Sequence, residues 1–183
     1  ILPGKAGRSG SGPDPRKPLY FRAVADFCWE IVDSPLDELL LIASDAGIAR
    51  IAWDFGDPER YATDDLGRLG GKSATRSWNP LLKEARSQLG SWFCGEIKEF
   101  DLPLAPDPRA GESFSQRVLA VTASIPRGET MTYGEVAREA GNHRGARAAG
   151  NALGANTIPV IVPCHRVVAA DGIGGFGGGT GRK

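Results

Sequence analysis

Cysteine and histidine are scarce in this sequence, with three cysteines and two histidines among 183 residues. The number of cysteines is odd, and the three lie far apart in the sequence, at Cys28, Cys94 and Cys164. This argues against a disulfide framework and is typical of a protein in a reducing cytosol. Together with His143 and His165 they show no metal-ligand spacing, so no metal site is expected.

Long apolar runs and a net charge are also missing. No apolar run approaches the roughly 20 residues of a membrane span, and the N-terminus lacks the apolar core of a secretion signal. We therefore expect no membrane partner and a cytoplasmic protein, associated with the nucleoid if the source is a bacterium.

The even charge balance of 22 basic and 22 acidic residues conceals an asymmetry. Residues 108–183 hold nine basic residues, eight of them Arg, against five acidic ones. Arg makes bidentate contacts with phosphates, so this half is a candidate for nucleic-acid binding. A solvated basic surface is the alternative.

Composition also divides the chain. Residues 1–18 are rich in Gly, Pro, Ser and basic residues without apolar periodicity, which predicts a disordered leader. Residues 19–107 are expected to form a scaffold domain that ends in a proline-rich linker. Residues 108–183 are expected to form a second domain.

The scaffold domain is predicted to combine strands with one helix. Three β-rich runs separated by turn residues indicate an antiparallel meander, at 21–31, 38–44 and 47–53. Residues 54–79 are polar and Gly-rich and suggest an irregular excursion. A helix over 80–93 follows, with Asn79 as its N-cap and Pro80 in its first turn. A short strand is expected at 100–104.

The second domain is predicted to be mostly helical. A helix over 114–124 stops before Pro126. Thr132 and Glu135 have the spacing of a capping box, which opens a helix over 133–140 that ends at Gly141. A third helix covers 144–153. Two short helices joined by a Gly-containing turn are typical of a helix-turn-helix, although many such pairs never touch DNA.

A candidate reactive thiol lies in the segment Pro163-Cys164-His165-Arg166. The β-branched run at 158–162 before it predicts a buried strand. A thiolate is a strong nucleophile where neighbouring positive charge lowers its pKa, and His and Arg supply that charge. A buried structural cysteine is the alternative.

Four blocks carry a resemblance to one family. These are Ile125-Pro126-Arg127-Gly128-Glu129 with Thr132-Tyr133-Gly134-Glu135-Val136-Ala137, Gly145-Ala146-Arg147-Ala148-Ala149-Gly150, Asn156 through Val168, and Gly177-Gly178 with Arg182-Lys183. In this order they resemble the methylated-DNA–protein-cysteine methyltransferases, or alkylguanine-DNA alkyltransferases. The resemblance covers nearly all of residues 114–183, and 33–36 match more loosely.

The resemblance implies a fold, a reaction and a partner. The fold would be α+β, with an N-terminal, ribonuclease-H-like antiparallel sheet plus helix, and a C-terminal helical, winged-helix or helix-turn-helix-like domain. The protein would be a monomer that binds double-stranded DNA with alkylated guanine in the minor groove and flips the base out. The Cys164 thiolate would take the alkyl group from the 6-oxygen of guanine, and from the 4-oxygen of thymine. No cofactor is implied, and each protein would act once.

The resemblance also implies roles for individual residues. The small residues Gly145 and Ala146 would let a helix approach DNA, Arg144 would contact it, and Arg147 would fill the gap left by the extruded base. Tyr133 would assist base rotation and donate a proton to guanine. A hinge at Asn156 would join the recognition helix to the active site, and the substrate pocket would be lined by Pro159, Val167, Phe176, Gly177 and Gly178. Close helix packing, a surface ion pair at Arg147 and a core tyrosine are the structural alternatives.

His165 follows Cys164 directly, so its imidazole needs a turn or a bridging water to deprotonate the thiol. The resemblance implies that water, and a glutamate on a C-terminal helix that holds the imidazole. That helix would lie beyond Lys183, so the second domain is expected to be truncated and the thiolate less populated near pH 7. A lesion-binding protein without transfer activity and a cysteine hydrolase are the two rival functions.

Overall fold

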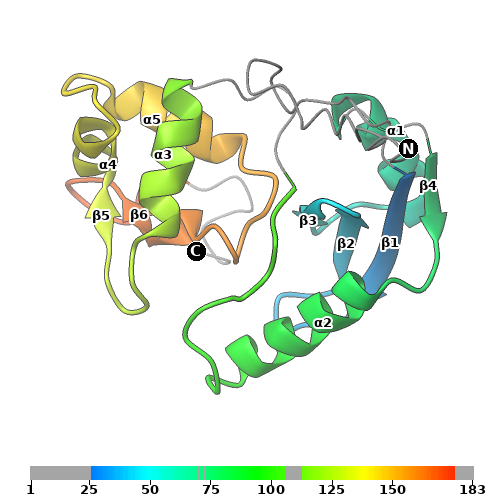
Figure 1. Ribbon diagram of the computed structural model, residues 1–183. Coiled ribbons are helices and arrows are strands. Elements are labelled where there is room, and N and C mark those ends of the chain that lie inside the picture. Colours follow the sequence, from blue (N-terminus) through cyan, green and yellow to red (C-terminus); the bar gives the residue numbers. More distant parts are fainter. Residues whose placement is uncertain (1–25, 70, 72, 106–112, 176–183) are drawn as a thin grey trace, which may run out of the picture.

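The fold is described by a computed structural model that covers residues 26–69, 71, 73–105 and 113–175. It has an N-terminal part with a sheet and two helices, and a C-terminal part with three helices, as Figure 1 shows. The α+β class predicted from the sequence is confirmed. The predicted leader at 1–18 lies outside the described residues. Within them, no helix combines the length and the apolar character needed to cross a bilayer.

A four-stranded sheet forms the N-terminal part. Its strands are β1 (Asp26–Val32), β2 (Leu39–Ser44), β3 (Gly47–Ala52) and β4 (Ser73–Arg76), in the order β3-β2-β1-β4. The first three are antiparallel neighbours, which confirms the predicted meander. β4 instead pairs in parallel with β1.

The prediction of an irregular excursion at 54–79 was wrong. This stretch holds α1 (Pro58–Leu69) as well as β4. Asp57 opens the helix, since its carboxylate accepts a hydrogen bond from the Arg60 amide at 2.7 Å. This side-chain cap before Pro58 is a helix start signal, which outweighs the Gly and Asp content of the segment.

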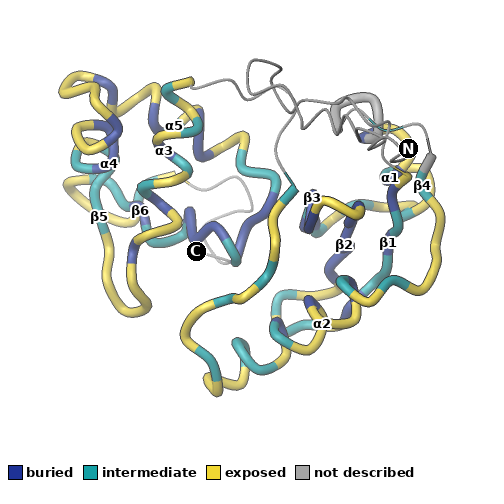
Figure 2. Tube along the Cα trace, in the orientation of Figure 1, coloured by how far each residue is buried: buried dark blue, intermediate teal, exposed yellow. Residues whose placement is uncertain are grey.

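Both faces of the sheet are covered. Residues of β2 alternate between two clusters, because successive side chains of a strand point to opposite faces. On one face, Leu39 and Leu41 pack with Leu82, Ala85 and Leu89 of α2 (Pro80–Phe93). On the other face, Leu40 and Ile42 pack with Phe27 and Trp29 of β1 and with Ala62 of α1. β2 is therefore buried along its length, as the dark blue tube in Figure 2 shows.

The strand expected at 100–104 is wrong in extent, because only Leu104 forms a bridge, with Ile48. The Ile48 amide donates to the Pro103 carbonyl at 2.8 Å, and the Ala105 amide donates to the Ile48 carbonyl at 2.9 Å. Gly47 permits this close approach, since a Cβ on it would lie 2.5 Å from the Pro103 oxygen. Prolines on the incoming segment limit the pairing to this point.

Three helices form the C-terminal part: α3 (Phe114–Ala123), α4 (Tyr133–Glu139) and α5 (Ala146–Gly154). The predicted capping box of α4 is confirmed, because the Glu135 amide donates to Thr132 Oγ1 and the Thr132 amide donates to Glu135 Oε2. The Thr132 hydroxyl also donates to Glu135 Oε2, at 2.8 Å, and the hydrogen bonds from the Thr132 amide and hydroxyl hold the pKa of the Glu135 carboxyl below its ordinary value. The chain turns at Gly141, whose φ of +86° favours glycine, and α5 begins two residues later than predicted.

The buried strand predicted at 158–162 is wrong, although Ile158 and Val160 are buried as expected. The Val162 amide donates to the Ile158 carbonyl at 2.9 Å, and Val160 has a φ of +74°, so the run is a tight turn. Asn156 bonds the Ile158 amide and the Val162 carbonyl, and Pro159 and Pro163 have no N–H to offer a strand partner. The run packs instead on the core beneath the sheet, which brings the active-site turn against the N-terminal part.

Candidate active site and DNA-binding helix

Cys164 opens η1 (Cys164–Arg166), a single turn of 3-10 helix, and is 8% exposed. η1 leads into the short strand β6 (Val167–Val168), which pairs in parallel with β5 (Met131–Thr132) just before α4. The thiol belongs to the apolar core of the C-terminal part. Cys164 and His165 are thus successive residues of one tight helical turn and not of a strand.

Asn156 connects the end of α5 to the thiol. Its Nδ2 donates to Cys164 Sγ at 3.3 Å and to the Val162 carbonyl at 3.0 Å. Its Oδ1 accepts from the Ile158 amide at 3.0 Å. An N–H group that points at sulfur favours the thiolate over the thiol. The contacts fit the predicted hinge, and they add a second use of Asn156 as a donor to the sulfur.

Asn156→Asp is expected to make Cys164 harder to ionise. An aspartate keeps an acceptor for the Ile158 amide but loses both donors and adds negative charge beside the sulfur. Hydrogen bonds to charged groups contribute about 1.5–3 kcal/mol, and one pKa unit is about 1.4 kcal/mol. The midpoint of the iodoacetamide reaction of Cys164 against pH should therefore rise by about one unit or more. Asn151→Asp, at an exposed position of α5, is the control; an equal rise there would show a general charge effect.

Tyr133 lies at the start of α4, as predicted, with its ring above α5. A Cβ on Gly150 would lie 3.8 Å from the ring, so helix and ring are in close contact. The hydroxyl donates to the Gly175 carbonyl at 2.9 Å. Burial, and then the charge on Cys164, raise the pKa of Tyr133 above its ordinary value. The phenol is therefore protonated at neutral pH, and its one hydrogen is donated to the Gly175 carbonyl in this structure.

The loop after β6 comes close to this phenol. Gly174 has a φ of +75°, and a Cβ on it would lie 3.1 Å from Ala169 and 3.2 Å from the Tyr133 ring. Only glycine fits this position without a shift of its neighbours.

The predicted pocket is only partly described. Pro159 is buried, and Val167 is completely buried in the core of the C-terminal part. Phe176, Gly177 and Gly178 lie outside the described residues. The pocket assignment therefore stays a prediction.

His165 is half-buried and lies against the N-terminal part. Its ring pairs with that of Trp92 in the last turn of α2, with ring centroids 6.3 Å apart and planes at 73°. Trp92 is a residue that sequence reasoning missed as a neighbour of this histidine. No sequence signal connects it to a histidine more than 70 residues later, and the contact depends on how the two parts pack.

The Arg166 side chain contacts the segment that follows α3. Its Nη1 donates to the Ile125 carbonyl at the end of α3. Burial, and then the nearby charge of Arg127, lower the pKa of Arg166. Arg166 therefore anchors η1 to α3, while it contributes positive charge next to the active-site turn.

The exposed side of α5 is almost bare. Ala146, Arg147 and Ala148 are exposed, whereas Ala149 and Leu153 face the core. Gly145 is the N-cap and is buried against Asn142. Arg147 is therefore the one long side chain at the exposed start of the helix.

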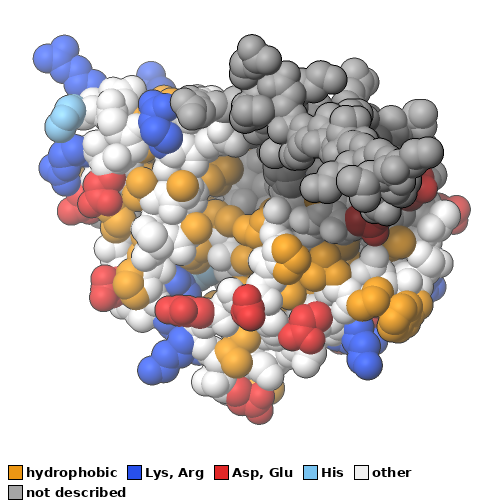
Figure 3. All heavy atoms as spheres, viewed as in Figure 1, with side chains coloured by type: hydrophobic (Ala, Val, Ile, Leu, Met, Phe, Trp, Pro, Cys, Tyr) orange, Lys and Arg blue, Asp and Glu red, His pale blue; other side chains and the backbone are white. Residues whose placement is uncertain are grey.

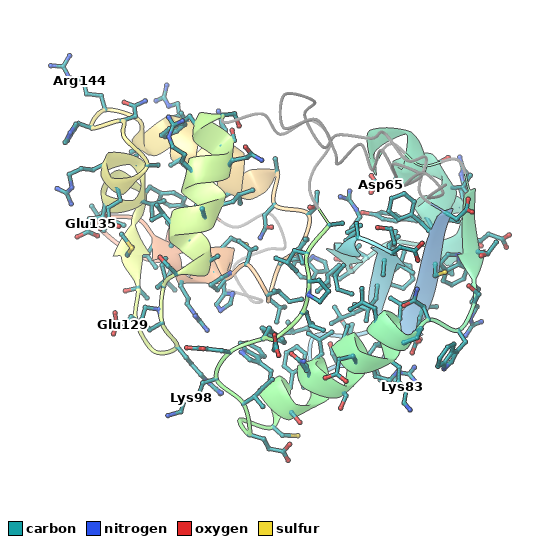
Figure 4. The ribbon with its side chains drawn as sticks, in the orientation of Figure 1. Asp65, Lys83, Lys98, Glu129, Glu135 and Arg144 are labelled. Carbon is teal, nitrogen blue, oxygen red and sulfur yellow. The ribbon has the colours of Figure 1, made fainter. Side chains whose placement is uncertain are left out.

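Basic side chains surround this end of the molecule. In Figure 3, Lys and Arg side chains gather over α4 and α5, at the upper left. Arg144, labelled in Figure 4, points outward from the turn before α5. The helix thus offers a smooth backbone with positive charge around it, which is suited to a nucleic-acid groove.

Within the described residues, no group of three or more His, Cys, Asp or Glu side chains is arranged to hold a metal ion. Cys164, Asn156, Tyr133 and His165 contribute a thiol, an amide donor, a protonated phenol and an imidazole. These groups can supply a nucleophile and a proton donor.

Known proteins share this arrangement of sequence and structure. Residues 113–183 match the family model described as 6-O-methylguanine DNA methyltransferase, DNA binding domain. The methylated-DNA–protein-cysteine methyltransferase of Methanosarcina acetivorans is 36% identical over 147 residues, which cover 79% of this chain and 85% of that protein. The enzyme of the same name from Mycobacterium tuberculosis is 39% identical over 159 residues, with 85% and 87% covered.

Solved structures give the same result. The crystal structure of the Mycobacterium tuberculosis O6-methylguanine methyltransferase superposes with a TM-score of 0.68 at 34% identity, and covers 85% of this chain and 87% of that one. The structure of Mycobacterium tuberculosis OGT in complex with DNA has a TM-score of 0.66 at 33% identity, with 86% and 87% covered. The chain belongs to the methylated-DNA–protein-cysteine methyltransferase family.

Proposed function

We propose that this protein repairs DNA by moving an alkyl group from the 6-oxygen of guanine, and from the 4-oxygen of thymine, to Cys164. Family membership supports the reaction class. The observation that carries the assignment to this residue is the 3.3 Å contact from Asn156 Nδ2 to Cys164 Sγ, on a turn next to a protonated phenol. A structural cysteine needs neither group.

The chemical step is a direct displacement. The Cys164 thiolate attacks the alkyl carbon, a carbon–sulfur bond forms, and the bond from that carbon to the guanine oxygen breaks. Guanine leaves as an anion and takes a proton from the Tyr133 hydroxyl. The proton that left the thiol passes through His165 and water and restores the Tyr133 hydroxyl. The thioether has no hydrolytic exit, so each protein molecule acts once.

DNA recognition is assigned to α5. Its start, Gly145 to Ala148, has one long side chain, so its backbone can approach the floor of the minor groove. Arg147 would then enter the base stack and hold the extruded nucleotide outside the duplex, while Arg144 contacts a phosphate. We propose that the protein does this as a monomer, in the cytoplasm or on the nucleoid.

Mass spectrometry of the intact protein after mixing with an O6-methylguanine duplex tests this function. We expect one methyl group per protein, located on Cys164 by peptide mapping, and no further turnover with excess DNA. Binding without an adduct would favour a lesion sensor, and repeated turnover without an adduct would favour a cysteine hydrolase. Either result contradicts the proposal.

A further inference from the structure

Trp92 occupies the centre of an aromatic cluster at the end of α2. Phe100 lies 5.9 Å from it in a stacked arrangement with planes at 26°, and Phe93 lies 5.1 Å away at 81°. The Arg127 guanidinium lies over the Trp92 ring, 5.6 Å from its centroid. The indole is therefore held by neighbours on several sides.

This cluster joins the two parts of the molecule. Trp92 and Phe100 come from the N-terminal part, and Arg127 comes from the loop after α3. Arg127 Nη1 also donates to the Ile97 carbonyl at 3.0 Å. The groove around them, with a volume of about 480 Å³, is lined by Trp92 and Phe100 from one part and by Arg127 and Arg166 from the other. The position of the indole relative to η1 is thus fixed from both sides.

Within the described residues, His165 connects the active-site turn to this cluster through a ring pair. Its imidazole lies edge-on to Trp92, at 6.3 Å and 73°. Edge-to-face pairs have a preferred geometry, so a fixed indole restricts the rotation of the imidazole about its Cβ–Cγ bond. An imidazole can relay a proton from the neighbouring thiol only if the correct nitrogen is aimed at it.

We propose that Trp92 is a positioning residue for His165, and that the N-terminal part thereby sets the reactivity of Cys164. The inference rests on the proposed function. Trp92 does not touch the reacting atoms and lies outside residues 113–183, the stretch matched by the DNA-binding family model. The scaffold then has a chemical role beyond support.

The test compares Trp92→Leu, Trp92→Tyr and wild type, with free O6-methylguanine base as substrate so that DNA binding plays no part. General base catalysis contributes about 10²–10⁴-fold, and loss of ring orientation should remove about tenfold of this at pH 7. Above pH ~9 an ordinary thiol, with a pKa of about 8.5, ionises unaided. The Trp92→Leu and wild-type rates should therefore converge there, while Trp92→Tyr should restore most of the neutral-pH rate.

Trp78→Leu is the matched control, since it makes the same substitution in the N-terminal part at a side chain that is 76% exposed and forms no described ring pair with His165. Its rate should stay within about twofold of wild type at all pH values. A loss in Trp92→Leu by the same factor from pH 6 to 10 would show a purely structural role, and an unchanged rate would show no role; both overturn the inference. If Trp92→Leu does not fold, Trp92→Met, whose unbranched side chain adapts to an irregular space, serves in its place.

The reaction of Cys164 with iodoacetamide separates this inference from the proposed function. It reports the imidazole's effect on the thiol whether or not alkylguanine is a substrate. A wild-type protein that leaves O6-methylguanine intact contradicts the proposed function alone. An iodoacetamide profile that is identical in Trp92→Leu and wild type contradicts the inference alone.

Discussion

Cys164→Ser is expected to abolish alkyl transfer while DNA binding stays within a few fold of wild type. A serine hydroxyl is close in size to the thiol and can accept the hydrogen bond from Asn156 Nδ2 that now reaches sulfur at 3.3 Å. The turn and the core around it should therefore be preserved. A hydroxyl is hardly ionised near neutral pH, so no nucleophile remains. Adduct mass should fall below detection in the same intact-protein experiment.

The other two cysteines provide the controls. Cys94 is exposed, and Cys28 in β1 is half-buried, with its sulfur accepting a hydrogen bond from Ser77 Oγ at 3.1 Å. Cys28→Ser and Cys94→Ser should each take up one methyl group at a normal rate. Transfer that persists in Cys164→Ser and disappears in either control would move the acceptor to the N-terminal part and end the assignment to Cys164.

Local signals in the sequence predicted most helices. Asn79 caps α2 through hydrogen bonds from the Leu81 and Leu82 amides, and Thr132 with Glu135 opens α4. A cap is made by residues within one turn of each other, so its chemistry can be recognised without knowledge of the fold. The start of α1 at Asp57 has the same kind of signal, hidden by the polar residues that follow it.

No local signal of this kind indicates the turn before the active site. An apolar run at 158–162 indicates burial but cannot by itself distinguish a strand from an irregular buried segment. Here the side chain of Asn156 bonds the Ile158 amide and the Val162 carbonyl, and Val160 takes a positive φ. The run is thus satisfied locally, and its burial comes from the N-terminal sheet.

The residues of the candidate site also fall into those that a sequence motif indicates and those that it does not. Tyr133, Asn156, Cys164 and Arg147 follow from motif resemblance, and the structure places Asn156 against the Cys164 sulfur and Tyr133 against the core to which Cys164 belongs. Trp92 could not be found, because its approach to His165 depends on the packing of two parts that the sequence connects only through a linker. Contacts of high sequence separation carry no local signature.

Arg147→Ala is expected to slow repair of an O6-methylguanine duplex about 10–100-fold, and to change the reaction with the free base by less than about threefold. Unstacking and unpairing a nucleotide cost a few kcal/mol, and about 1.4 kcal/mol corresponds to tenfold in rate. A guanidinium that fills the vacated space offsets part of this cost, and the free base never requires it. Arg147 is exposed at the start of α5, so its removal should leave the fold intact.

Arg144→Ala is the matched control, because Arg144 is also exposed and lies at the same end of the molecule, in the turn before the helix (Figure 4). Loss of a phosphate contact should weaken binding to damaged and undamaged duplexes equally and reduce the salt dependence of binding. It should not slow the chemical step once DNA is saturating. Arg147→Ala should remain slow at saturating DNA, since extrusion follows binding. If Arg147→Ala lowers the rate of alkyl transfer equally with the duplex and with the free base, Arg147 acts in the chemical step or in the fold. If the rate of Arg147→Ala recovers fully at saturating DNA, Arg147 only contacts a phosphate.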